Sequence, residues 1–191
     1  MSDKLSSLKV GIDVPWVTSW TAETMEGVAR CDSVGGRPAL VQTSHAGYGK
    51  PQYSLNHMVR QRLTVTQMLC PMCGEPTPVG DRWTLTARLA PAGRLRAERG
   101  IHLPSEVHDD QMVVDAGAIA PLHRDCARRS MKLCPHLRAD PDLKLARFPE
   151  RHVVIPLMAA PADGGGAPPV IGFLQLCAIT ATIDRRWRRA D

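Results

Sequence analysis

Two short pairs of residues carry the clearest chemistry in this sequence. Cys70 and Cys73 stand three positions apart in a Cys-Pro-Met-Cys-Gly segment, and His123 and Cys126 repeat that spacing further along the chain. Two cysteines at this spacing in a tight turn can direct both sulfurs at one cation, and thiolates favour zinc or iron over harder ions. Residues three apart in the first turn of a helix share a face, so His123 and Cys126 can complete a tetrahedral site. The sequence therefore predicts a structural zinc site with these four ligands.

Cys134 is the main rival for the fourth ligand position. In a helix that begins near His123, Cys134 lies about two turns, or ~12 Å, beyond Cys126. We therefore expect it to be a buried thiol behind the metal site, although four cysteines including Cys134 remain the alternative ligand set. Spacing does not separate zinc from iron, but a closed set of nitrogen and sulfur ligands favours zinc. A redox pair is disfavoured, because a glycine and then a strand follow Cys73, whereas a helix follows the pair in thioredoxin-like motifs.

The remaining cysteines and histidines show no ligand spacing. Cys31 and Cys177 are solitary and are expected to be buried free thiols. We interpret five histidines as ordinary surface or core residues: His45, His57, His102, His108 and His152. His136 instead forms the competing ligand pair together with Cys134.

Several elements are needed to position the metal ligands. Ser54 is expected to cap a helix that leads into Cys70, with Arg60, Gln61 and Arg62 on its exposed side. Alternating hydrophobicity predicts a half-buried strand over residues 83–89. A second helix is expected to open near His123 and to end before Pro135.

The rest of the chain is punctuated by glycine and proline. Residues 1–35 are expected to form an irregular arm that packs Trp16 and Trp20 onto the core. The other expectations are a strand over 37–42, a loop over 43–53, a surface excursion over 90–111, a short strand over 112–114, and a β-hairpin of 152–160 with 170–183.

These elements predict an α+β fold, a small mixed domain with an embedded treble-clef-like zinc site and a C-terminal β-hairpin. At 191 residues with 43% hydrophobic content, the chain can build a core that does not depend on metal alone. We divide it into an N-terminal arm and strand (1–53), a zinc-binding core (54–140), and a hairpin with a basic tail (141–191) that belongs to the same domain.

The order of the motif resembles known zinc fingers. A cysteine knuckle, a strand and then ligands at a helix N-terminus are similar to a treble clef. The segments Leu69–Gly74, Pro121–Ala127 and Cys134–Leu137 also resemble small zinc-finger proteins of actinobacteria and their phages, over roughly the middle two-fifths of the chain. This resemblance implies that both halves of the motif belong together, with Cys134-Pro135 as part of the pattern. It implies no activity.

Charge favours a polyanionic partner. The formal net charge is +5, and Arg124, Arg128 and Lys132 recur every four residues along the predicted ligand helix. The tail places arginines on both sides of Trp187, which suits backbone contact and base stacking; they are Arg185, Arg186, Arg188 and Arg189. Binding to DNA or RNA is therefore narrowly favoured over a protein-interaction module.

Catalysis is the least supported class. An HNH-type nuclease also uses a treble-clef scaffold, but here zinc claims His123, while His102 and His108 lie in a polar segment. The longest nearly uncharged apolar stretch, 170–183, is too short to span a bilayer, and the N-terminus lacks the apolar region of a secretory signal. We therefore expect a cytoplasmic protein without a membrane partner. The sequence does not define its oligomeric state.

Overall fold

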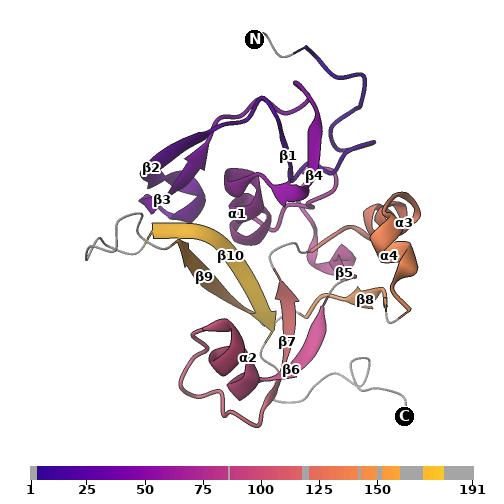
Figure 1. Cartoon of the computed structure of the whole chain (residues 1–191). Coiled ribbons are helices and arrows are strands. Elements are labelled where there is room, and N and C mark those ends of the chain that lie inside the picture. The colour runs from indigo at the N-terminus through magenta and orange to yellow at the C-terminus, as the bar shows by residue number, and fades with distance from the viewer. Residues whose placement is uncertain are drawn as a thin grey trace.

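A computed structural model of the chain describes residues 4–85, 87–117, 121–141, 143–149, 152–159 and 170–178 (Figure 1). The strands are β1 (Thr18–Trp20), β2 (Met25–Cys31), β3 (Arg37–Gln42), β4 (Pro51–Asn56), β5 (Trp83–Thr84), β6 (Arg88–Pro91), β7 (Met112–Gly117), β8 (Ala146–Arg147), β9 (Val153–Ala159) and β10 (Val170–Ala178). The helices are η1 (Asp32–Val34), α1 (Met58–Thr66), η2 (Val79–Asp81), α2 (Ala92–Arg99), α3 (Arg124–Leu133) and α4 (Pro135–Ala139). The fold is mixed, as the sequence predicted.

A six-stranded sheet organises the molecule. Its order is β2-β3-β10-β7-β6, and β9 pairs with β10 off this path. β10 runs parallel to β3 and antiparallel to β7 and β9, so one strand joins three others (Figure 1). The predicted strand at 37–42 and the predicted short strand beginning at Met112 are confirmed as β3 and β7. β9 and β10 form the predicted antiparallel pair, and the connection between them lies outside the described residues.

The predicted helix cap at Ser54 is wrong. Ser54 lies inside β4, so the loop expected over 43–53 also gives way to a strand from Pro51 onward. The helix begins three residues later, where the Nδ1 atom of His57 accepts a hydrogen bond from the backbone N–H of Arg60 at 3.3 Å. An imidazole nitrogen here does the work that a serine hydroxyl usually does at an N-cap.

The polar side of α1 faces inward, opposite to the prediction. Arg60, Gln61 and Arg62 are 5%, 0% and 0% exposed. The Arg62 guanidinium donates to the backbone oxygens of Gly172 at 2.8 Å and Leu40 at 2.7 Å. The Gln61 amide both donates to and accepts from the backbone of Leu174. The helix is thus hydrogen-bonded directly to the sheet, which offsets the cost of burying its polar groups.

Arg60 is held by a buried carboxylate from the N-terminal segment. Both oxygens of Glu23 accept from its guanidinium, at 2.7 and 2.8 Å. The same carboxylate accepts from the backbone N–H groups of Trp20 and His45. Two opposite charges with four hydrogen bonds therefore fix the N-terminal segment against α1.

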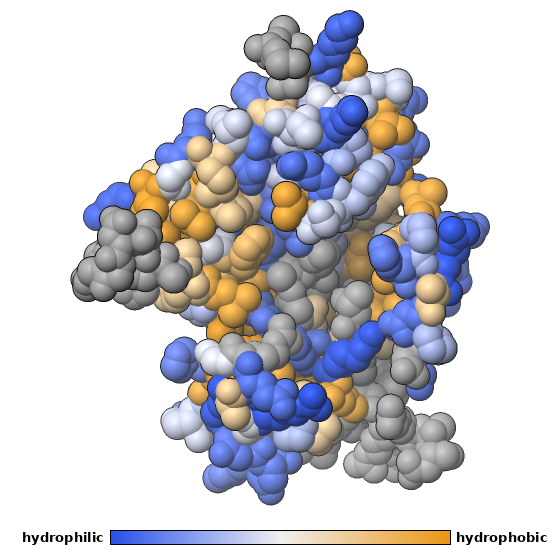
Figure 2. Space-filling model, viewed as in Figure 1, coloured by the Kyte–Doolittle hydropathy of each residue, from blue (hydrophilic) through white to orange (hydrophobic). Residues whose placement is uncertain are grey.

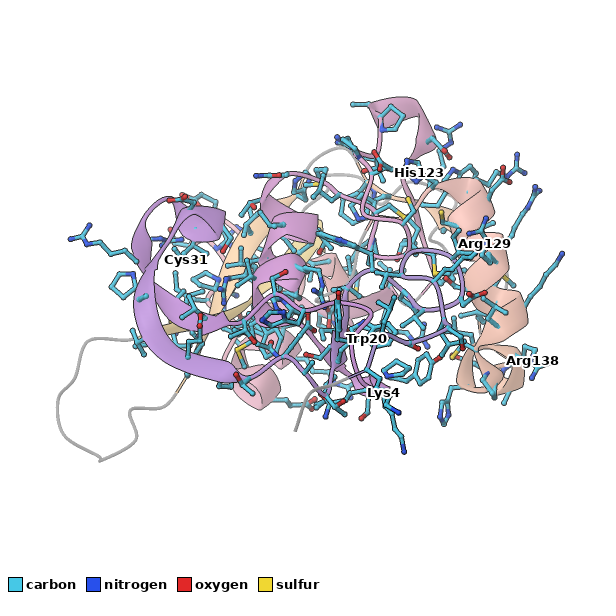
Figure 3. The ribbon with its side chains drawn as sticks, turned by 90° about the horizontal axis from the view of Figure 1, so that it is seen from above. Lys4, Trp20, Cys31, His123, Arg129 and Arg138 are labelled. Atoms are coloured by element: carbon cyan, nitrogen blue, oxygen red, sulfur yellow. The ribbon has the colours of Figure 1, made fainter. Side chains whose placement is uncertain are left out.

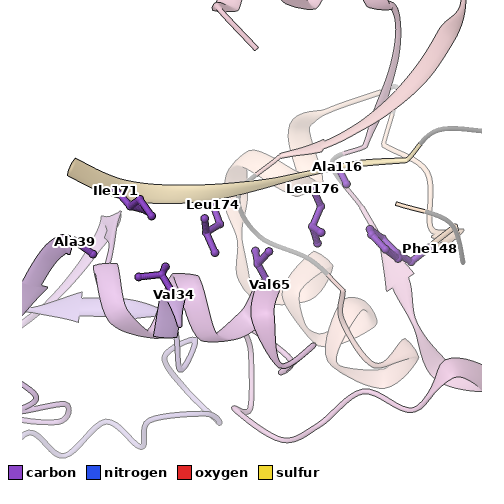
Figure 4. Close-up of a cluster of buried hydrophobic side chains, with 8 residues drawn as sticks. All are labelled: Val34, Ala39, Val65, Ala116, Phe148, Ile171, Leu174 and Leu176. Atoms are coloured by element: carbon purple, nitrogen blue, oxygen red, sulfur yellow. The ribbon is translucent and has the colours of Figure 1, made fainter. Parts of the chain in front are cut away.

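Apolar side chains fill the space between α1 and the sheet (Figure 4). This cluster comprises Val34, Ala39, Val65, Ala116, Phe148, Ile171, Leu174 and Leu176. A second cluster lies under α2 and corrects another expectation. Residues 90–111 are not a surface excursion, because Leu95, Ile101, Leu103 and Val107 are buried against Val113, Ile155 and Cys177.

Two further expectations need correction. The N-terminal segment is not irregular throughout, since it contains β1 and β2; Trp20 is fully buried as expected. The single strand expected over 83–89 is instead two strands, β5 and β6, with different partners. β5 pairs with β8, whereas β6 pairs with β7 in the large sheet.

Candidate metal centre

The first pair of candidate ligands lies in a tight turn after α1. The backbone N–H of Gly74 donates to the Cys70 carbonyl at 2.8 Å, and the N–H of Cys70 donates to the Glu75 carbonyl at 2.8 Å. Gly74 has a φ of 84°, a conformation that favours glycine. The chain therefore folds back on itself and brings Cys70 and Cys73 to the same side of the turn.

The N-terminal segment supports this turn from outside, a contact that the sequence pattern did not reveal. The N–H groups of Trp16 and Val17 donate to the carbonyls of Met72 and Pro71 at 2.8 and 3.0 Å. The Trp16 ring lies so close to Gly74 that an added Cβ there would be 2.9 Å from its Cγ. Two features therefore require glycine at position 74: the positive φ angle and the closeness of the Trp16 indole.

The second pair of candidate ligands lies at the start of α3, as predicted. His123 is the N-cap residue and Cys126 lies in the first turn. Two backbone hydrogen bonds of 2.8 Å between Trp83 and Leu122 hold the preceding segment against β5. The Asp81 carboxylate accepts from the N–H of Arg124 at 3.0 Å and from the Trp83 indole at 2.8 Å. The helix start is therefore fixed by η2 and β5.

The four candidate ligands converge. One ligand atom from each of Cys70, Cys73, His123 and Cys126 lies within 4.8 Å of every other. The His123 Nδ1 atom is 3.5 Å from the Cys73 sulfur and 3.9 Å from the Cys126 sulfur. Zinc with Zn–S of about 2.3 Å and Zn–N of about 2.0 Å places tetrahedral neighbours roughly 3.5–3.8 Å apart. The two distances from His123 Nδ1 thus fit a tetrahedral ion of this size, and the remaining donors lie within 4.8 Å.

The orientation of His123 also suits a metal ligand. Its Nε2 atom lies 3.1 Å from the Pro76 carbonyl, which can only accept a hydrogen bond. The proton therefore belongs on Nε2, and the lone pair of Nδ1 points toward the three sulfurs. A carbonyl behind the second ring nitrogen is the usual outer contact of a metal-bound histidine.

Electrostatics in this cluster call for a cation. Burial raises the pKa of the Cys70 thiol, and backbone N–H groups of Cys73, His123 and Met72 act in the opposite direction. Burial also raises the pKa of Cys126, and the neighbouring Cys70 and Cys73 raise it further. Three thiolates at this spacing repel one another, whereas a divalent ion stabilises all three together. The described cysteines are all free thiols, so no disulfide competes.

Cys134 does not join the cluster. It is the C-cap residue of α3, and its N–H donates to the Ser130 carbonyl at 2.9 Å. Its side chain is partly exposed, so the expected buried thiol is wrong. α3 ends before Pro135, as predicted, and Pro135 then starts α4. Cys177 is buried as expected, whereas Cys31 is only partly buried.

The described part of the chain contains one group of three or more potential metal ligands, which is the cluster of Cys70, Cys73, His123 and Cys126. His102 and His108, which were considered as residues of a nuclease site, therefore belong to no group of potential metal ligands among the described residues. His57, expected to be an ordinary residue, is a buried helix cap, with its Nε2 atom 2.9 Å from the Thr43 carbonyl.

The predicted basic residues of α3 are exposed. Arg124, Arg128 and Lys132 lie on the side of the helix opposite Cys126 and Ala127, which are buried. Arg129 and Arg138 lie on the outer side of α3 and α4 (Figure 3). The predicted tail contacts Arg185, Arg186, Arg188 and Arg189 lie outside the described residues.

Arg147, a neighbour of this surface, has no signal in the local sequence. The guanidinium carbons of Arg124 and Arg147 each lie 5.1 Å from the centre of the Trp83 ring. Such contacts hold the two cations in place beside the start of α3. We use the name α3 basic face for Arg124, Arg128, Arg129, Lys132 and Arg147. Arg147 reaches this surface because β8 pairs with β5, and the sequence around Arg147 does not indicate that pairing.

Comparison with protein-family models, with curated proteins and with solved structures finds no match for this chain. Among the helices of the described residues, none has both the length and the hydrophobicity needed to cross a bilayer.

Proposed function

We propose that this chain is a zinc-stabilised protein that binds nucleic acid through the α3 basic face. Zinc would be held by Cys70, Cys73, His123 and Cys126 in a closed site, without an open position for substrate. The observation that carries the proposal is the convergence of four donor atoms at the start of the helix that bears the basic residues. The metal would thereby fix the α3 basic face relative to the sheet.

The charge on this face supports a phosphate-bearing partner. Two acidic side chains adjoin it. Asp81 accepts from the Arg124 N–H at 3.0 Å, and Asp125 is 3.5 Å from Arg128 and itself 90% exposed. Exposed ion pairs of this kind contribute little and are easily exchanged for a phosphate contact. The figures agree, since hydrophilic side chains cover the part of the surface where α3 and α4 lie (Figure 2).

A salt titration tests the proposed function. If Arg124, Arg128 and Lys132 each neutralise one phosphate of duplex DNA, the affinity falls about 40-fold between about 50 and about 200 mM salt. The measurement is fluorescence anisotropy of a labelled duplex and of a labelled single-stranded RNA with the full chain. The double variant Arg128→Ala with Lys132→Ala should lower the slope of log K against log salt by about 2.

The control is the double variant Lys50→Ala with Arg94→Ala. It removes two exposed cations elsewhere, one just before β4 and one on α2. It has the same net charge as the test variant and should keep the wild-type slope. Affinity that is equal in both variants would contradict a role for the α3 basic face. A zinc-loaded wild type that binds neither nucleic acid would favour a protein partner instead.

A further inference from the structure

Trp83 holds one arginine of the α3 basic face in place from the strand side. The N–H and C=O groups of Trp83 both bond to Leu122 at 2.8 Å on one edge of β5. On the other edge Trp83 lies opposite Arg147 of β8, in a pair that exchanges no hydrogen bonds. Side chains approach most closely in such pairs, and the Arg147 guanidinium lies over the indole. It also donates to the Gly80 carbonyl at 2.9 Å, so two contacts fix this exposed cation.

Arg124 reaches the same ring from the other edge of β5. It follows Leu122 by two residues and begins α3, which lies beside β5 and β8 (Figure 1). Its guanidinium carbon is 5.1 Å from the centre of the indole. The Asp81 carboxylate accepts from the Arg124 N–H and from the indole N–H, at 3.0 and 2.8 Å. Both arginine side chains are thus ordered before a ligand arrives, which lowers the entropic cost of binding.

Within the described residues, the α3 basic face offers cations but no free aromatic ring. Trp83 is only partly exposed, and a nucleobase stacked on it would compete with the two guanidiniums. The aromatic side chains that the described part of the chain exposes are Tyr48 and Tyr53, just before and within β4. Proteins that bind single strands combine cations with aromatic rings on which successive bases stack. This face therefore lacks the second part of a single-strand site.

The row of cations along α3 suits the regular phosphates of a duplex. Arg124, Arg128 and Lys132 are four residues apart, so they follow one another at ~6 Å along one side of the helix. A duplex presents phosphates at fixed positions, with one charge per about 1.7 Å of helix axis. A single strand is flexible and must be ordered against the row. Arg147 adds a fourth cation beside the start of α3.

We propose that the α3 basic face binds a double-stranded nucleic acid, and that Trp83 positions Arg124 and Arg147 for two of its phosphates. This inference rests on the proposed function and adds to it the strandedness of the ligand, a fourth phosphate contact and a positioning residue. Four contacts give a slope of log K against log salt of about −3.6 for a DNA duplex and about −2.8 for a single strand. If the two affinities meet near about 1 M salt, the duplex binds about 6-fold tighter at about 0.1 M.

Anisotropy titrations of the full chain over a range of salt concentrations test the strandedness. The labelled probes share one sequence: a DNA duplex, an RNA duplex and the corresponding single strands. The duplexes should bind more tightly, and Trp187→Ala in the tail should leave that preference unchanged. Binding of the DNA duplex alone would assign B-form geometry, and equal binding of both duplexes would assign the phosphate backbone that they share. Single strands that bind as tightly as the duplexes would overturn the inference and keep the proposed function, whereas a chain that binds no probe would overturn the proposed function itself.

Variants test the two new contacts. Arg147→Gln should lower the slope on the DNA duplex by about 0.9, and the matched control Arg94→Gln, an exposed arginine on α2, should keep it. Trp83→Leu retains every cation, so it should keep the slope and lower the duplex affinity about fivefold, the cost of ordering two long side chains. Trp83→Phe keeps a ring beside the guanidiniums and should restore most of the affinity.

Circular dichroism and metal content establish that each variant is folded. An unchanged slope in Arg147→Gln would remove the fourth contact. A loss in Trp83→Leu that is larger for the single strand than for the duplex would show base stacking and overturn the positioning role of Trp83.

Discussion

Replacing Cys126 by serine should destabilise the chain about as much as removing the metal. The candidate ligands Cys73 and His123 are 50 residues apart in sequence, so a shared ion closes a long loop. A cross-link over about 50 residues restricts the unfolded chain by about 4 kcal/mol. An ion present at about a thousand times its dissociation constant stabilises the fold by a similar ~4 kcal/mol.

The assay combines metal content with urea unfolding, in the presence and absence of a chelator. If the four residues hold the proposed zinc ion, Cys126→Ser should lose it together with about 4 kcal/mol of unfolding free energy. The matched control is Cys134→Ser, which should keep both, because Cys134 lies outside the ligand cluster. The chelator should destabilise the wild type and the control but leave Cys126→Ser nearly unchanged. Zinc retained by Cys126→Ser, or lost by Cys134→Ser, would refute the assignment of ligands.

Two other substitutions probe the cap of α1 and the turn that carries Cys70 and Cys73. Burial, and secondarily the charge of Arg60, lower the pKa of His57 in the folded chain. As the pH drops below about 6.5, the pKa of histidine in the unfolded chain, the unfolded chain takes up a proton before the folded one does. The free energy of unfolding should therefore fall. Urea midpoints at pH about 7.5 and about 5.5 should differ less for His57→Gln than for the wild type, and an equal difference would rule out His57 as the titrating group. Gly74→Ala should lower the free energy of unfolding in urea by about 1–3 kcal/mol, because position 74 has a positive φ and lies against the Trp16 ring. The control Gly80→Ala, which has open space at its Cβ position, should leave the free energy of unfolding nearly unchanged. Equal effects of the two substitutions would contradict this account.

The features predicted correctly from sequence have local signals. The spacing of Cys70 with Cys73 and of His123 with Cys126 reflects the geometry of one turn and of one helix start, which few residues determine. β3 follows two glycines, and both strands of the β9–β10 pair lie in largely apolar runs. In each case the residues that specify the structure are close neighbours in the chain.

The missed features depend on partners far away in sequence. Arg60, Gln61 and Arg62 read as a solvent-facing set because nothing nearby shows that Glu23 and the β10 backbone will satisfy them. Residues 90–111 read as a surface excursion because Leu95 and Ile101 are buried by strands from other parts of the chain. Burial of polar side chains is a tertiary property, and hydrophobic periodicity does not report it.

The position of β10 in the chain sets an order of assembly. β10 is the last described strand, yet β3, β7 and β9 all pair with it, and the polar groups of α1 find their acceptors on its backbone. During synthesis, residues 4–159 emerge before the strand that joins them. Contacts that span more than 100 residues form slowly because a long loop must close first. The two pairs of candidate ligands emerge earlier, so the metal centre can assemble before the sheet. In a nascent chain, β2 and β3 would meanwhile expose both edges, which makes this interval the one in which the protein most needs protection from aggregation.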